Sequence, residues 1–292
     1  MKLLAERVPA PVKRLIHTGT RTYGRLTASG RLLPGFLVCG GQRCGTTSLY
    51  RLLSSHPAIL KPIFHKGIHY FDTGYHNGIN WYRAHFPTRA SAVRVGEQTG
   101  LAAQAFESSP YYLYHPLAAE RFSRDLPGVK LIVLVRDPVE RARSQHAHEL
   151  ARGFEDILDF RQAVEAEEKR LTGEIDQLQR DPHHYSFSHQ HHAYTLRGQY
   201  TDHLERIARV IAPERILVVD SGDFFTDPEP VYDRILRFLG LPWLGDPVFA
   251  QHNARPRKAL ADTTVEARLR KHFAPYDERL AEWLGTTPSW HR

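Results

Sequence analysis

Residues 40–48 of this chain read Gly-Gly-Gln-Arg-Cys-Gly-Thr-Thr-Ser, a pattern that can bind phosphate. An apolar run precedes them and a helical pattern of leucines follows, which predicts a strand, a turn and a helix. The backbone N–H groups of such a turn and the positive end of the helix dipole attract anions. Gly40 and Gly45 match the spacing of a P-loop, but Thr46 stands where its lysine is expected, and Arg43 lies inside the loop. The altered loop points away from an ordinary ATPase or GTPase.

A second candidate anion site follows the apolar run at residues 129–135. Arg136 comes at the expected carboxyl end of that strand, where parallel α/β sheets bind ligands. Asp137 is expected to cap the next helix, and Ser144 falls two turns into it. A guanidinium and a hydroxyl can then converge on one phosphate, although an N-capped helix with surface arginines is the alternative. Two such sites predict a ligand with phosphates at two separated positions.

The elements that position these motifs can be read from apolar runs and helical periodicity. We expect strands at residues 36–39, 129–135 and 215–220, and helices at 46–54, 139–152, 199–211 and 229–239. Continuous apolar strands that alternate with helices predict a parallel sheet covered on both faces. The expected fold is α/β, a P-loop-like three-layer fold with a central parallel sheet flanked by helices. We expect a basic N-terminal arm over residues 1–33 and one domain over residues 34–292.

Composition narrows the class of protein. The chain has 292 residues and a net charge of +7, which suits an anionic ligand, nucleic acid or a membrane surface. No stretch approaches the roughly 18 to 20 apolar residues of a membrane span, and residues 1–33 lack the apolar core of a signal peptide. We expect the arm to be a loosely packed terminus, with peripheral membrane contact as the alternative. Two cysteines, Cys39 and Cys44, form no disulfide framework, which favours a cytoplasmic location.

Residues 165–192 are polar and charged, and they are rich in histidine: His183, His184, His189, His191 and His192. A metal site would need supporting carboxylates or cysteines, and no such framework accompanies the histidines. We therefore expect no metal, and a solvated insertion or substrate-facing loop.

Taken together, these motifs resemble the PAPS-dependent sulfotransferases, especially the heparan-sulfate-type branch and its bacterial relatives. Residues 42–49 resemble that family's 5′-phosphosulfate loop, and residues 135–144 resemble its 3′-phosphate segment. Counterparts are also found for the segments at 69–72, 107–112, 196–200 and 237–241. The similarity runs from about residue 34 to the C-terminus, and the order and spacing of the motifs make it specific.

The resemblance implies an enzyme that moves a sulfuryl group from PAPS to a hydroxyl and releases adenosine 3′,5′-bisphosphate. The implied donor contacts are Gln42, Arg43, Cys44, Gly45, Thr46, Thr47, Ser48, Arg136 and Ser144. Arg43 would neutralise the bridging oxygen as the S–O bond breaks, so no metal is required. Arg257 and Lys258 either close over the nucleotide or form a solvated basic loop. We expect a carbohydrate, glycolipid or other small-molecule acceptor, no nucleic-acid partner, and a bacterial cytoplasmic enzyme.

The sequence offers several candidates for the base that takes the acceptor proton. The heparan-sulfate-type branch commonly reads Lys-Glu-x-His-Phe-Phe-Asp, with the glutamate as base, whereas residues 66–72 here read Lys-Gly-Ile-His-Tyr-Phe-Asp. Gly67 thus replaces that glutamate, and Ser108 replaces a lysine often found in the family's Glu-Lys-Thr-Pro motif. Lys66 is expected only to assist with charge.

Three candidates for the base remain: His69, Glu107, and a residue that the sequence does not single out. His69 is the first choice because an unperturbed imidazole titrates near pH 6.5. Asp72, three residues further on, is expected to orient it. A structural histidine packed on the neighbouring aromatic side chains is the alternative.

Two other classes of protein compete with the sulfotransferase. A P-loop kinase-like phosphotransferase would need Mg²⁺ and an acid after a strand, a place that Asp220 could fill, although a capping role fits Asp220 better. A catalytically impaired nucleotide-binding relative would keep both anion sites and lack turnover.

Overall fold

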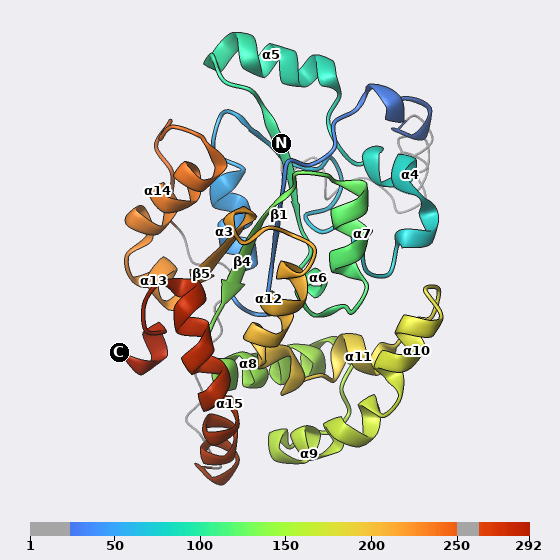
Figure 1. The fold of residues 1–292 in the computed structure, drawn as a ribbon, viewed down its shortest axis with the longest axis vertical. Helices are drawn as coiled ribbons and strands as arrows, with labels where there is room; N and C mark the ends of the chain where they lie inside the picture. The colour runs from blue at the N-terminus through green and yellow to red at the C-terminus, as the bar shows by residue number, and fades with distance from the viewer. Residues whose placement is uncertain (1–23, 250–262) are drawn as a thin grey trace, which may run out of the picture.

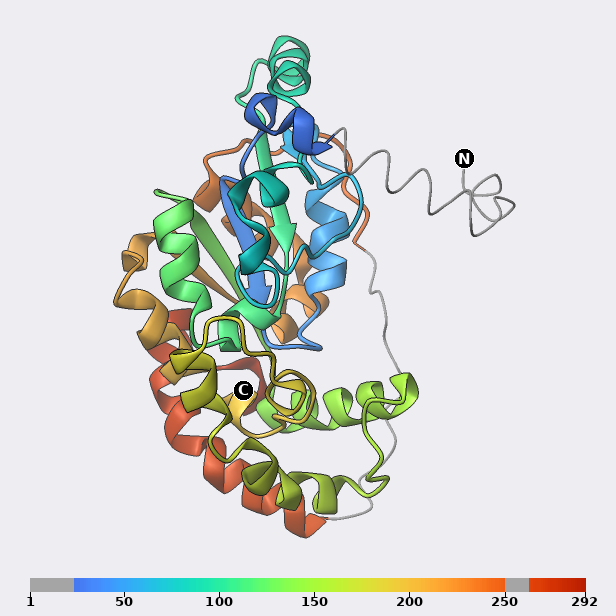
Figure 2. The ribbon, with the colours of Figure 1, turned by 90° about the vertical axis from the view of Figure 1, so that its right-hand side faces the viewer.

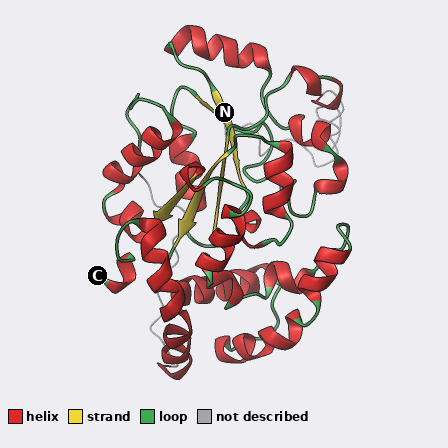
Figure 3. Cartoon of the chain, in the orientation of Figure 1, coloured by secondary structure: helices red, strands yellow, loops and turns green. Residues whose placement is uncertain are grey.

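The computed structural model describes residues 24–249 and 263–292. Within them, five strands form one parallel sheet in the order β2-β3-β1-β4-β5 (Figure 3). The strands are β1 (Phe36–Gly40), β2 (Ile59–Leu60), β3 (Gln104–Ser108), β4 (Lys130–Val135) and β5 (Ile216–Asp220). Every paired strand runs parallel to its neighbour, so the carboxyl ends of all five meet at one edge.

Helices cover both faces of this sheet. Figure 2 shows α3 (Thr46–Leu53) on one side, and α7 (Ala118–Asp125) and α12 (Tyr200–Ala208) on the other. This confirms the predicted three-layer α/β fold. Further helices are α4 (Ile79–Arg83), α5 (Arg89–Thr99), α6 (Tyr111–Tyr114), α13 (Ser221–Thr226), α14 (Pro228–Leu239) and α15 (Thr263–Leu284).

The central strands are apolar and buried from end to end. All residues of β1 are buried, and so are residues 131–135 of β4. The ring of Phe36 stacks on the ring of Phe106 in β3, with centroids 5.0 Å apart. Burial of apolar surface stabilises a fold by about 25 cal/mol per Å². The apolar runs that predicted the strands are therefore also the core of the sheet.

A group of helices lies beyond the carboxyl edge of the sheet, in the lower half of Figure 1. It consists of α8 (Pro138–Arg152), α9 (Phe160–Leu171), α10 (Glu174–Arg180) and α11 (Phe187–His191). The sequence predicted a solvated insertion or loop over much of this region, and the structure differs. The buried carboxylate of Glu155 accepts hydrogen bonds from Arg170 and from the hydroxyl of Tyr194, which holds the helices together.

The histidines of this region are mostly internal. His189, His191 and His192 are buried, and Nδ1 of His189 lies 2.7 Å from the hydroxyl of Tyr111. Burial lowers the pKa of His189 to about 2, so its ring is neutral. Within the described part of the chain, no group of three or more His, Cys, Asp or Glu side chains could hold a metal ion. His189, His191 and His192 are packed in the interior, and each is hydrogen-bonded there.

The predicted N-terminal arm is described only from residue 24 onward. Arg31 is buried there, and its guanidinium donates to the carbonyl of Phe86 at 2.7 Å. Residues 24–33 therefore pack on the domain, while residues 1–23 lie outside the described ranges. No helix in residues 24–249 or 263–292 is long and apolar enough to cross a membrane.

Candidate functional site

The loop between β1 and α3 turns as the glycine spacing predicted. Gly40 has φ +128°, and a Cβ there would lie 2.3 Å from the carbonyl oxygen of Leu134. Gly45 has φ +85° and is the residue immediately before α3. Arg43, which lies between the two glycines, adopts a left-handed φ of 74°. The first N–H groups of a helix have no partner within it. The loop therefore presents backbone donors at the carboxyl edge, with the positive end of α3 behind them.

The two predicted anion sites lie next to each other. Nε of Arg43 donates to Oγ of Ser144 at 3.0 Å, and Nη1 of Arg136 donates to the carbonyl oxygen of Arg43 at 3.3 Å. Asp137 caps α8 by accepting from the backbone N–H groups of the first turn, which places Ser144 on the face toward the loop. The structure thus brings together the groups that were predicted to bind two separated phosphates.

The remaining loop residues are held by internal contacts. Gln42 donates to Oε1 of Glu149 at 2.6 Å and accepts from Arg197 at 2.8 Å. The carbonyl oxygen of Cys44 accepts from the Ser221 hydroxyl at 2.6 Å. Burial raises the pKa of the Cys44 thiol, which makes a reactive thiolate unfavourable. Gln42 and Cys44 therefore anchor the loop to its surroundings, and Ser48 is buried in the first turn of α3.

Lys66, which the sequence predicted only to assist with charge, lies directly over this loop. Nζ of Lys66 donates to the hydroxyls of Thr46 and Thr47, at 3.0 and 3.2 Å. Burial lowers the pKa of Lys66 to about 7, although the charge of Glu107 opposes the shift. The missing lysine at position 46 was the signal for such a residue, but sequence spacing could not identify which distant lysine supplies the charge.

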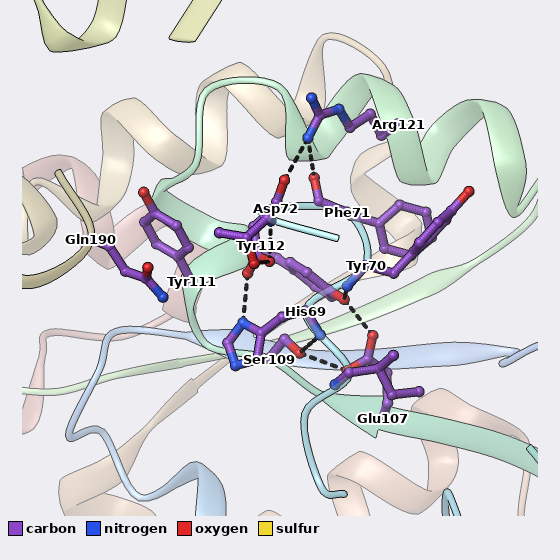
Figure 4. Close-up of polar contacts among 12 residues, drawn as sticks. His69, Tyr70, Phe71, Asp72, Glu107, Ser109, Tyr111, Tyr112, Arg121 and Gln190 are labelled. Atoms are coloured by element: carbon purple, nitrogen blue, oxygen red, sulfur yellow. Dashed lines mark hydrogen bonds and ion pairs between the residues drawn. The ribbon is translucent and has the colours of Figure 1, made fainter. Parts of the chain in front are cut away.

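Glu107, one candidate for the base, is fully buried at the end of β3. Its Oε2 accepts from the N–H of Ile68 at 3.0 Å and from the hydroxyl of Ser109 at 2.7 Å. Its Oε1 accepts from the hydroxyls of Tyr82 and Tyr112, at 3.0 and 2.6 Å. Burial raises the pKa of Glu107, against the effect of these donors. Figure 4 shows this carboxylate beneath the segment that carries His69, a position suited to holding that segment.

His69 and Asp72 form a hydrogen-bonded pair at the surface of the site. Nδ1 of His69 lies 2.7 Å from Oδ2 of Asp72, and the pair is drawn in Figure 4. The Asp72 side chain is fully buried, whereas that of His69 is 41% exposed. Because an ionised carboxylate only accepts, Nδ1 carries a proton and Nε2 is left to interact with a substrate.

The electrostatics of this pair raise the pKa of the imidazole. Burial disfavours the charged ring of His69, but the charge and hydrogen bond of Asp72 outweigh it and raise the pKa of His69 above 6.5. Burial alone would raise the pKa of Asp72, and its pairing with His69 instead lowers the pKa below the usual range. Arg121 donates to the carbonyl oxygen of Asp72 at 2.7 Å, which fixes the backbone of the pair.

Gly67 is in close contact with its neighbours. A Cβ at this position would lie 2.8 Å from the carbonyl oxygen of Ser108 and 3.4 Å from Nε2 of His69. A side chain at position 67 would therefore collide with the backbone after β3. The position where the family's glutamate would begin is thus adjacent to the free nitrogen of His69.

Asp220 has a different role from that of a metal-binding acid. Its carboxylate accepts from the N–H of Gly222 at 2.7 Å and from the N–H and hydroxyl of Ser289, at 2.7 and 2.8 Å. Asp220 therefore caps α13 and binds the C-terminal segment, as its capping interpretation predicted. Arg257 and Lys258, the remaining predicted donor contacts, lie outside the described residues.

Comparison with known proteins identifies the family. A family model described as the sulfotransferase domain matches residues 33–261, most of the chain. The chain therefore belongs to the sulfotransferase family, as the resemblance predicted. The human bifunctional heparan sulfate N-deacetylase/N-sulfotransferase 3 is 31% identical over 218 residues, which cover 72% of this chain and 22% of that protein. The chain thus spans about a fifth of that relative's length.

In two further comparisons the match covers a larger share of the related protein. Human heparan sulfate glucosamine 3-O-sulfotransferase 5 is 27% identical over 287 residues, covering 88% of this chain and 74% of that one. The crystal structure of a sulfotransferase from Alicyclobacillus acidocaldarius has a TM-score of 0.66 and 26% identity. That match covers 89% of this chain and all of the other, and it agrees with the parallel sheet and flanking helices described above.

The hydrogen bonds of Glu107 predict an effect on stability. We expect Glu107→Gln to lower the free energy of unfolding by about 1–3 kcal/mol, because an amide cannot accept from all four donors. Urea denaturation measures the change. The matched control is Glu97→Gln, since Glu97 is exposed on α5. Equal stability of the Glu107→Gln variant and the wild type would contradict a holding role for this carboxylate.

Proposed function

We propose that this protein transfers a sulfuryl group from PAPS to a hydroxyl of a carbohydrate or related small-molecule acceptor. The observation that carries the proposal is the position of His69, whose free Nε2 lies next to Gly67 and whose Nδ1 is bound by Asp72. A base at this point, close to two adjacent anion sites, suits an enzyme that moves a group from a doubly phosphorylated nucleotide.

The chemistry of the donor set fits PAPS. The hydroxyls of Thr46 and Thr47 and the first N–H groups of α3 suit the oxygens of the 5′-phosphosulfate. Arg136 and Ser144 suit the 3′-phosphate, since a guanidinium and a hydroxyl form charge-assisted hydrogen bonds with phosphate oxygens. Arg43 contacts Ser144 and Arg136, so it can neutralise negative charge beside them. No metal ligand is needed in this scheme.

The transfer step follows from the orientation of His69. PAPS, when bound, supplies a sulfuryl group whose sulfur can accept a new S–O bond while its bond to the 5′-phosphate oxygen breaks and leaves the electron pair there. Nε2 of His69 takes the proton of the acceptor hydroxyl. Asp72 holds the ring and stabilises the imidazolium that forms. Glu107 acts as a positioning residue because its oxygens already accept four hydrogen bonds.

The acceptor class and the location are also part of the proposal. The names of the two human relatives specify heparan sulfate, and one specifies glucosamine, which supports a carbohydrate acceptor. The two cysteines are buried and free, which agrees with a cytoplasmic enzyme. The Alicyclobacillus structure, which this chain matches along most of its length, supports a bacterial origin.

Removal of the proposed base tests the function. With PAPS and a panel of carbohydrate acceptors, we expect the wild type to release adenosine 3′,5′-bisphosphate in the presence of EDTA. His69→Ala should lower kcat by about 10²- to 10⁴-fold, the usual contribution of a general base, while calorimetry shows unchanged bisphosphate binding. The control is His76→Ala, an exposed histidine nearby. Normal turnover of His69→Ala would remove this residue from the role.

The proposed contact of Arg136 with the 3′-phosphate predicts that the protein discriminates between nucleotides with and without this phosphate. Arg136→Ala should weaken binding of adenosine 3′,5′-bisphosphate by about 10- to 100-fold, the usual worth of a charged hydrogen bond. Binding of adenosine 5′-monophosphate, which lacks the 3′-phosphate, should stay the same. Isothermal titration calorimetry gives both affinities, with the exposed Arg237→Ala on α14 as the control. Equal weakening for the two nucleotides would argue against a 3′-phosphate contact.

The His69–Asp72 pair also predicts a pH dependence. A base works in its neutral form, so kcat/KM should rise with pH through the raised pKa of His69. Asp72→Asn keeps an acceptor for Nδ1 but removes the negative charge, so the pKa should fall and the rising limb should move to lower pH. The profile is measured from about pH 5 to pH 9. A limb that stays in place would show that another group controls it.

A further inference from the structure

The lysine that a P-loop carries in the first turn of its helix is absent here, yet an ammonium lies at that turn. Lys66 belongs to the segment between β2 and β3, twenty positions beyond Thr46 in the sequence. Its Nζ donates to the hydroxyls of Thr46 and Thr47, the first two residues of α3. The charge is therefore supplied by a different segment of the chain.

The backbone of Lys66 is held firmly in this position. Its carbonyl oxygen accepts from the N–H of Ser108 at 2.9 Å, which joins it to the end of β3. Two residues further on, the N–H of Ile68 donates to the buried carboxylate of Glu107. Because β3 pairs directly with β1, these contacts place the Lys66 side chain over the loop that follows β1.

The arginines of the site have other contacts. Nε of Arg43 donates to Ser144, and the guanidinium of Arg136 contacts the carbonyl oxygen of Arg43 and the carboxylate of Glu140. Both arginines are therefore directed toward α8 and the proposed 3′-phosphate contacts. Lys66 is directed toward the opposite end of the loop, where the helix begins.

We infer that Lys66 is a catalytic residue that binds the 5′-phosphosulfate and stabilises the charge that develops on the bridging oxygen. This inference rests on the proposed function and assigns its 5′-phosphate end to a residue outside the loop. Lys66 supplies the charge that the lysine of a P-loop would supply, which is absent at Thr46. The ammonium can move from the threonine hydroxyls to the phosphate oxygens without a change in the backbone.

The charge environment gives Lys66 a property that an arginine would lack. Burial lowers the pKa of Lys66 to about 7, and the charged groups that act on it or titrate beside it are Glu107, which opposes the shift, and His69. An anionic ligand binds the protonated amine. Binding above pH 7 must therefore take up a proton, so affinity for a 5′-phosphate should fall as the pH rises.

The test compares adenosine 3′,5′-bisphosphate with adenosine 3′-monophosphate, which lacks the 5′-phosphate. Lys66→Met should weaken binding of the bisphosphate by about 10- to 100-fold and leave the 3′-monophosphate unchanged. In Lys66→Arg, the affinity for the bisphosphate should be largely kept but should no longer fall between about pH 7 and pH 9, because arginine does not titrate there. The matched control is Lys61→Met, an exposed lysine in the same segment.

The possible results separate the inference from the proposed function. If the wild type binds neither nucleotide, the proposed function fails. If the wild type binds the bisphosphate and Lys66→Met binds it equally well, the inference on Lys66 fails and the proposed function stands. A merely structural lysine would weaken both nucleotides alike in Lys66→Met, and thermal unfolding of each variant would detect a loss of fold.

Discussion

The buried carboxylate of Glu107 is the interaction on which the site depends. Placing a carboxylate in the interior is costly unless donors surround it, and here four hydrogen bonds offset that cost. The donors come from four places: residues 66–72, helix α4 through Tyr82, the turn after β3 through Ser109, and helix α6 through Tyr112. Since Ile68 lies between Lys66 and His69, one buried group sets the position of both the proposed phosphate ligand and the proposed base.

The order of the strands explains why this arrangement works. Strand β1 lies between β3 and β4, so the segments at their carboxyl ends are neighbours. Residues 66–72 are hydrogen-bonded to the end of β3. The anion-binding loop follows β1, and β4 leads to Arg136 and Ser144. Lys66 contacts Thr46, and Arg43 contacts Ser144. These two contacts join the three segments one after another along the edge of the sheet. A parallel sheet thus aligns the proposed base and two phosphate sites along one edge.

The sequence predicted the parts of the structure that depend on local patterns. Apolar runs identified β1, β4 and β5 because buried parallel strands read as continuous hydrophobic stretches. Strand β3 escaped detection because Glu107 interrupts it, and an isolated sequence does not reveal that four donors will surround that carboxylate. Likewise, the loop glycines could be read from spacing, whereas the contact of Lys66 with α3 depends on how β3 pairs with β1. The helices of residues 160–191 were missed because the segment is polar and charged in composition, although side chains such as Glu167 and His189 are buried in the fold.

Gly67 stands where the resemblance to the family places a glutamate, and its contacts involve the neighbouring residue His69. His69 adopts a left-handed φ of 56°, a conformation that costs a residue with a side chain about 1–3 kcal/mol. Its N–H donates to the hydroxyl of Ser109 and its ring to Asp72, which offset this strain. In that conformation Nε2 lies 3.4 Å from where a Cβ of residue 67 would be. A side chain at position 67 would therefore touch the ring of His69 in this orientation. The proposed base is an imidazole next to this position, and the charge and hydrogen bond of Asp72 raise its pKa above 6.5.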